Sequence, residues 1–178
     1  MKILINDHEV VFNKEDFPMF INGADKSGAS FFSISFLANL FENGKKVLLF
    51  SAFDPAKEEF RKQLNDSINE NALIIESGDE ENFIKELDNI NDLSDRIVLC
   101  KNVENYSLNL FNKLKDKKLV IFSGDIDRCE FGEQLVNKDF NTKIFFSYTG
   151  KMKVENTIEL PKYKGLIISS KYNGVISL

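Results

Sequence analysis

The chain has 178 residues and a mass of 20.4 kDa, with 43% hydrophobic and 29% charged residues. These values are typical of one soluble globular domain and exclude disorder, collagen and coiled coil. The net charge of −5 gives no strong nucleic-acid signal, and the apolar runs are far shorter than the roughly 20 residues of a membrane span.

Apolar periodicity predicts strands that alternate with helices through most of the chain. The predicted strands are residues 2–5, 9–12, 19–22, 47–50, 73–75, 97–100, 119–122 and 143–146. The predicted helices are residues 31–41, 55–64, 80–90, 107–114 and 126–136. This rhythm indicates an α/β fold of three layers, a mostly parallel sheet with helices on both faces.

The last part of the sequence changes character. Residues 154–160, 165–172 and 175–178 alternate without helices, and Asn173-Gly174 is a strong hairpin-turn signal. We therefore predict a C-terminal antiparallel hairpin. The predicted organisation is one domain over residues 1–178, built from an N-terminal hairpin (1–16), an α/β core (17–150) and a C-terminal β-hairpin extension (151–178).

The loop after the strand at residues 19–22 has the composition of a phosphate-binding loop. Gly23 follows the strand, Gly28 comes five positions later, and Ser30 opens the helix, which is the spacing G-x-x-x-x-G-K-[ST] with Ala29 in place of lysine. Glycines permit a tight turn, and backbone N–H groups beside a helix N-terminus favour an anion. The predicted cofactor-binding residues are Gly23, Ala24, Asp25, Lys26, Ser27, Gly28, Ala29 and Ser30.

Two residues of this loop have alternative interpretations. Ser30 either holds Mg²⁺ through its hydroxyl or is only the N-cap of a glycine-rich turn into the helix. Lys26 either remains solvated or directs its ammonium toward a phosphate from a new backbone position.

The loop and the strands around it resemble the RecA/KaiC-like branch of the P-loop ATPases, from about Met19 to the C-terminal hairpin. The resemblance implies a RecA-like fold, ATP or ADP with Mg²⁺ as cofactor, and side-by-side packing into a homo- or hetero-oligomer. The branch represented by MinD and ParA is a weaker match, because the lysines that its loop carries are absent here.

The groups that the RecA/KaiC-like family uses in catalysis are missing from their expected places. Ala52-Phe53 stands near the position of a catalytic glutamate, with Asp54 as the nearest carboxylate. The strand expected to end in a metal-binding aspartate runs into Lys101-Asn102. The segment Ser123-Gly124-Asp125 keeps a polar residue where the family senses the terminal phosphate. Phosphoryl transfer depends on positioning and charge stabilisation, so these losses together predict a degenerate ATPase.

Three hypotheses follow for the function. The first is a degenerate P-loop protein that binds nucleotide, or serves as an interaction subunit, with little or no ATP hydrolysis. The second is an active NTPase in which Lys26 replaces the loop lysine and Asp54 or Asp125 replaces the missing acids. The third is a scaffold whose loop binds nothing.

Several other chemistry-bearing residues are interpreted more simply. Asp125, Asp127 and Arg128 follow a strand, so they either line the same crevice as the loop or start a helix. His8 is the only histidine and is predicted to be a surface residue. Cys100 and Cys129 are predicted to be core residues of a protein in the reducing cytoplasm, and the N-terminus lacks the pattern of a secretory signal.

Overall fold

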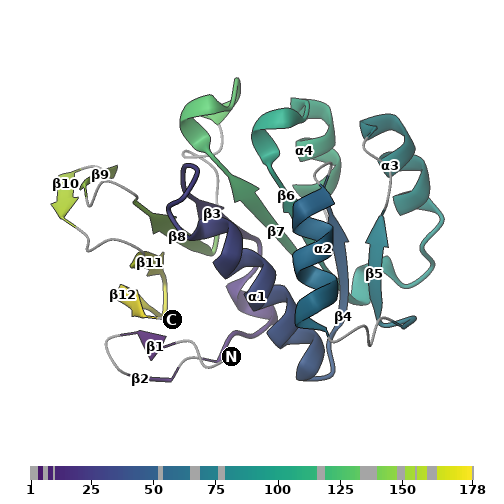
Figure 1. The fold of residues 1–178 in the computed structure, drawn as a ribbon, viewed down its shortest axis with the longest axis horizontal. Coiled ribbons are helices and arrows are strands. Elements are labelled where there is room, and N and C mark those ends of the chain that lie inside the picture. The colour runs from purple at the N-terminus through teal and green to yellow at the C-terminus, as the bar shows by residue number, and fades with distance from the viewer. Residues whose placement is uncertain are drawn as a thin grey trace.

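The computed structural model describes residues 4–5, 8–9, 11–51, 54–64, 69–75, 79–115, 119–132, 140–147, 151–154, 156–159 and 164–177. The strands in Figure 1 are β1 (Leu4–Ile5), β2 (His8–Glu9), β3 (Met19–Asn22), β4 (Lys46–Phe50), β5 (Ala72–Ile75), β6 (Arg96–Lys101), β7 (Val120–Gly124), β8 (Thr142–Phe146), β9 (Lys151–Val154), β10 (Asn156–Glu159), β11 (Gly165–Ser169) and β12 (Asn173–Ser177). The helices are α1 (Ala29–Glu42), α2 (Asp54–Gln63), α3 (Glu80–Asp88) and α4 (Leu108–Lys115), and short 3₁₀ turns include η3 (Val103–Asn105) and η4 (Ile126–Arg128).

The main sheet has ten strands in the order β2-β1-β12-β11-β8-β3-β7-β6-β4-β5, and β9 pairs with β10 in a separate ribbon. The six strands from β8 to β5 run parallel to one another. Strands β11, β12, β1 and β2 extend that sheet in antiparallel fashion beyond β8. The predicted α/β class, with a mostly parallel sheet and a C-terminal antiparallel hairpin, is therefore confirmed.

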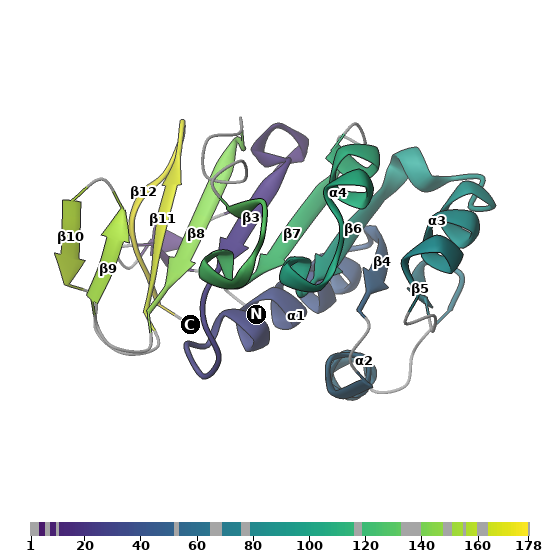
Figure 2. The same ribbon diagram turned by 90° about the horizontal axis from the view of Figure 1, so that it is seen from above.

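The connections reverse direction at the centre of the sheet, as Figure 2 allows the reader to follow. From β3 the chain passes through α1 and crosses β7 and β6 to reach β4, whereas from β7 it crosses β3 to reach β8. In parallel sheets, ligands bind at the carboxyl ends of strands beside such a reversal. A ligand site is therefore expected at the carboxyl ends of β3, β7 and β6.

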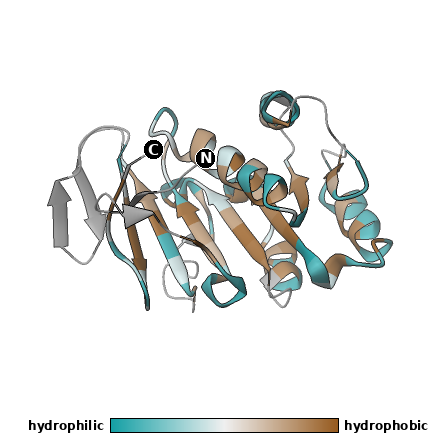
Figure 3. Cartoon of the chain, turned by 90° about the horizontal axis from the view of Figure 1, so that it is seen from below, coloured by the Kyte–Doolittle hydropathy of each residue, from teal (hydrophilic) through white to brown (hydrophobic). Residues whose placement is uncertain are grey.

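Each face of the sheet carries its own hydrophobic core, because successive residues of a strand point to opposite sides. In β4, Val47 and Leu49 join the cluster that contains α1 and α2, and Leu48 and Phe50 join the cluster that contains α3 and α4. Figure 3 shows the result as hydrophobic central strands, with hydrophilic residues along the helices and loops that cover them. Helix α1 is buried over most of its surface.

The C-terminal strands differ from the prediction in two places. Asn173-Gly174 lies inside β12, where Gly174 pairs with Ile167, so the predicted turn position is wrong. The chain reverses before it, because the Ser169 hydroxyl accepts hydrogen bonds from the backbone N–H groups of Lys171 and Tyr172 and closes a turn there. The run predicted as one strand over residues 154–160 is also divided, since Val154 ends β9 and Asn156 begins the antiparallel β10.

Two further predictions fall partly or wholly on residues that the structure does not describe. Of the helix expected at residues 126–136, residues 126–128 form the 3₁₀ turn η4, and residues 133–139 lie outside the description. The turn expected at Asn6-Asp7 lies outside it as well, although β1 and β2 pair on either side. Within the part of the chain that the structure describes, no helix has the length and apolar character needed to cross a membrane.

The packing of α3 gives a first testable prediction. The Phe83 ring is fully buried and stacks on Phe50 of β4, with ring centroids 3.5 Å apart. We expect Phe83→Ala to lower the free energy of unfolding by about 3–5 kcal/mol, because it leaves a cavity between α3 and the sheet. Urea denaturation measures this change. The matched control is Phe31→Ala, whose ring is 54% exposed and whose loss we expect to change stability by about 0.5 kcal/mol or less.

Candidate functional site

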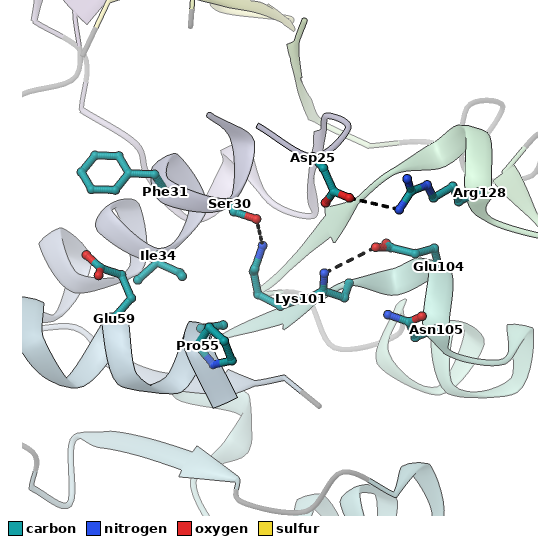
Figure 4. Close-up of a pocket in the computed structure, with 12 residues that line it drawn as sticks. Asp25, Ser30, Phe31, Ile34, Pro55, Glu59, Lys101, Glu104, Asn105 and Arg128 are labelled. Atoms are coloured by element: carbon teal, nitrogen blue, oxygen red, sulfur yellow. Dashed lines mark hydrogen bonds and ion pairs between the residues drawn. The ribbon is translucent and has the colours of Figure 1, made fainter. Parts of the chain in front are cut away.

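A pocket of about 600 Å³ lies at the carboxyl edge of the parallel strands (Figure 4). It is bounded by the loop before α1, the first turns of α1 and α2, the end of β6, and the turns η3 and η4. Its lining residues are Asp25, Ser30, Phe31, Ile34, Pro55, Ala56, Glu59, Lys101, Asn102, Glu104, Asn105 and Arg128. The pocket therefore stands beside the loop that the sequence analysis selected.

The loop between β3 and α1 folds back tightly on its first glycine. The Gly23 N–H donates to the Gly124 carbonyl at 3.1 Å, which joins the loop to the end of β7. A Cβ atom at Gly23 would overlap the Ser27 hydroxyl and lie 2.7 Å from the Ala29 Cβ, so only glycine fits. Gly28 has φ +99°, a left-handed conformation that glycine adopts without strain. The conformation of the loop therefore favours glycine at both glycine positions of the motif.

The start of α1 leaves backbone donors free. The first N–H groups of a helix have no acceptor within the helix. Here the Ala29 N–H donates to the Ser27 hydroxyl and the Phe32 N–H donates to the Gly28 carbonyl. The N–H groups of Ser30 and Phe31 have no acceptor among the described residues. Since Gly28 is the N-cap, the interpretation of Ser30 as the N-cap is wrong, and this end of the helix presents a partial positive charge.

Lys101 is the central side chain of the pocket. It ends β6, where Ile97 and Leu99 point to the α1 face, and strand alternation directs Lys101 to that same face. Its Nζ donates a hydrogen bond to the Ser30 Oγ at 2.7 Å, as Figure 4 shows. The residue is only 3% exposed. A buried ammonium is thereby fixed at the second residue of α1.

Burial lowers the pKa of Lys101 to about 8, because water no longer solvates the ammonium. The carboxylates of Glu104 and Asp25 act in the opposite direction and favour the charged form. Neither carboxylate forms an ion pair with Lys101, and none of the other described residues does so. At neutral pH the pocket therefore contains a largely charged cation without a charged partner in the described chain.

The carboxylates that line the pocket already have donors of their own. The Glu104 side chain accepts from the Asp125 N–H at 3.1 Å and from Asn102 at 3.4 Å. Asp25 forms an ion pair with Arg128 at 3.2 Å across the pocket opening. Glu59 accepts from Gln63 at 2.8 Å within α2. None of these carboxylates uses the remaining N–H donors of the Lys101 ammonium.

The predicted catalytic candidates are not brought together here. Lys26 is exposed, has φ +65°, and forms no ion pair or side-chain hydrogen bond with the described residues. Asp125 accepts from the Asp127 N–H at the start of η4 and does not line the pocket. Asp54 begins α2, and nothing is described of its side chain. Ala52 and Phe53 lie outside the described residues.

Of the predicted loop residues, Asp25 and Ser30 line the pocket, and Arg128 from the segment after β7 joins them. The position of Lys101 in the pocket was not predicted, since at the sequence level Lys101 only marks the absence of the expected aspartate. A signal was present: a lysine directly after the apolar run Ile97–Cys100 must lie at a strand end. Its direction toward Ser30 required the register of the sheet.

The two cysteines conform to the interpretation as core residues. Both are free and buried. Burial raises the pKa of the Cys100 thiol far above its ordinary value, and it raises that of Cys129 in the same direction. A thiol held in its neutral form is a poor nucleophile. His8 lies in β2 at the edge of the sheet, away from the strands that form the pocket.

No protein-family model matches this chain, and no curated protein matches it either. The geometry of the pocket is therefore the basis for any functional conclusion.

The buried ammonium leads to a prediction about stability. We expect Lys101→Met to raise the free energy of unfolding at neutral pH by about 1–3 kcal/mol, because it removes a buried charge that has no charged partner. In the wild type the pKa of Lys101 is lower in the folded protein (about 8) than the ordinary value of 10.5, so the unfolded chain binds the extra proton between these values. Stability gains from this group as pH rises through that window.

Urea denaturation at a series of pH values measures both effects. The advantage of Lys101→Met over the wild type should therefore shrink between about pH 8 and pH 10.5. A variant that is less stable than the wild type at neutral pH would show that the native protein already compensates the ammonium fully.

Proposed function

We propose that this chain binds a nucleoside phosphate in the pocket around Lys101 and hydrolyses it little or not at all. One observation carries the proposal: the buried Lys101 ammonium meets the positive end of α1 at Ser30, and no described residue forms an ion pair with it. Two positive features at one place favour an anion with several acceptor oxygens, and a phosphate has this chemistry.

The two ends of the pocket support a nucleotide rather than a simple phosphate. On one side lie Lys101, Glu104 and Arg128, whereas the other side contains Phe31, Ile34 and Pro55 together with the carboxylate of Glu59. Figure 4 shows Phe31 on the α1 side, beyond Ser30 as seen from Lys101. Its ring is 54% exposed, which is unusual for phenylalanine in this protein and leaves a face on which a base can stack.

The described groups of the pocket supply little for phosphoryl transfer. That reaction needs a positioned water or hydroxyl and cations that stabilise the charge on the transferred group. The pocket carboxylates Asp25, Glu59 and Glu104 are each held by another donor. Lys101 stands where the resemblance to the P-loop ATPases implies an aspartate. Binding without efficient turnover is the function that this arrangement supports best.

We also propose that the chain is a degenerate RecA-like P-loop domain. Its support is the glycine-bearing loop between β3 and α1, with Ser30 at the helix start, and the polar residue Ser123 near the carboxyl end of β7. Side-by-side packing into a homo- or hetero-oligomer, and a role as an interaction subunit, belong to the same proposal.

The proposal is tested by the melting temperature in the presence of ATP or ADP, because a ligand that binds only the native protein must raise it. We expect a rise with either nucleotide in the wild type. Phe31→Ala should reduce the rise with nucleotide but leave the rise with inorganic pyrophosphate, since only the base contacts the ring. The absence of any shift with the wild type would favour the scaffold hypothesis.

A phosphate-release assay tests the second half of the proposal. We expect no steady release of phosphate from ATP by the wild-type protein. Steady release that disappears in Lys26→Ala would instead establish the hypothesis of an active NTPase with a relocated lysine.

A further inference from the structure

We propose that Lys101 takes the place of a divalent cation in this pocket, so that the chain binds its phosphate-bearing ligand in the metal-free form. This inference rests on the proposed function, because it specifies which ionic form of the nucleotide the pocket accepts. It also departs from the expectation that Ser30 holds Mg²⁺.

The first support is the position of the ammonium. The hydroxyl expected to bind the metal is that of Ser30, and its Oγ already accepts a hydrogen bond from the Lys101 Nζ at 2.7 Å. Mg²⁺ binds oxygen at about 2.0–2.1 Å, so a metal on this hydroxyl would lie within about 5 Å of the ammonium. Two cations at such a separation repel each other, and the burial of Lys101 strengthens that repulsion. Lys101 and a metal thus compete for one place.

The second support is the lack of a metal-ligand set. Mg²⁺ prefers oxygen ligands in octahedral geometry, mostly carboxylates and water. Among the described residues, no cluster of histidine, cysteine, aspartate or glutamate has an arrangement that could hold a metal ion. The three carboxylates of the pocket already accept from Arg128, Gln63 or the Asp125 N–H. The described residues therefore do not fit Mg²⁺.

A buried hydroxyl also lies on the strand next to Lys101. Ser123 of β7 is the direct register partner of Lys101 and is 1% exposed. Ile121, two residues earlier, belongs to the α1 face, so alternation directs Ser123 to that same face. Its Oγ has no hydrogen-bond partner among the described residues. Buried hydroxyls rarely remain unsatisfied, but Ser123 is not among the residues that line the pocket, so it is a polar neighbour of Lys101 in the sheet and not a ligand contact.

Together these groups form a cation site that belongs to the protein. Lysine presents further N–H donors besides the one used by Ser30, and the N–H groups of Ser30 and Phe31 are free at the same end of α1. A phosphate oxygen placed there would meet the ammonium directly, as it meets a metal ion in a magnesium-dependent site. A nucleotide that arrives with its own Mg²⁺ would bring a second cation against Lys101.

The test is isothermal titration calorimetry with ADP, either in EDTA or with excess MgCl₂, at matched ionic strength. We expect the wild type to bind ADP at least as tightly in EDTA. Lys101→Met should weaken binding by about tenfold or more in both solutions, which is the effect of losing a hydrogen bond to a charged group. The control Lys113→Met removes a partly exposed lysine of α4 that pairs with Asp88 on the other face, and it should leave the affinity within about twofold of the wild type.

A charge reversal sharpens the experiment. Lys101→Asp supplies an oxygen ligand beside Ser30, so we expect its ADP binding to require MgCl₂. Circular dichroism checks the folding of each variant, and Lys101→Gln replaces any Lys101 variant that does not fold, with weakened binding in both solutions as its expected result.

The possible failures are distinguishable. Wild-type binding that occurs only with MgCl₂ would overturn this inference and leave the proposed function intact. Wild-type affinity in Lys101→Met, or metal-free binding by Lys101→Asp as tight as that of the wild type, would also overturn it. No ADP binding in either solution would overturn the proposed function, and this inference with it.

Discussion

The hydrogen bond from Lys101 to Ser30 joins the two elements on which the pocket depends, the end of β6 and the start of α1. It holds a positive side chain against the positive end of a helix, an arrangement that is unfavourable unless an anion accompanies it. Proteins rarely keep an ammonium 97% buried without a carboxylate beside it; the exposed fraction of Lys101 is 3%. This unfavourable pairing is the basis of the proposal that the pocket binds an anion.

The surrounding residues maintain this arrangement without neutralising it. Glu104 is near enough to favour the charged form of Lys101, yet its carboxylate is occupied by the Asp125 N–H at the end of β7. Gly124 makes this possible, because a Cβ atom at that position would collide with the Glu104 carboxylate. Arg128 and Asp25 pair at the exposed opening, where their attraction contributes little to stability. The acidic residues of the pocket thus surround Lys101 without forming an ion pair with it.

The sequence predicted the strands of the parallel sheet well, because a strand buried on both faces must be apolar throughout, as Val47–Phe50 and Ile97–Cys100 are. It also located the loop, since Gly23 and Gly28 occupy positions where a side chain or an ordinary backbone angle does not fit. The sequence did not predict that Lys101 lies in the pocket, because register decides which side chains meet across neighbouring strands. The hairpin signal Asn173-Gly174 failed for a related reason: the Ser169 side chain closes the reversal earlier in the chain.

The pairing of β1 with β12 has a consequence for how the chain reaches this structure. Leu4 lies opposite Ser177, so β1 pairs with a strand that is far from it in the sequence. Contacts between such distant segments require a large loop to close and form slowly. The parallel strands from β3 to β8 need no residue of β1 or β2 for their own ladders. The pocket can thus form before β1 and β2 dock onto β12.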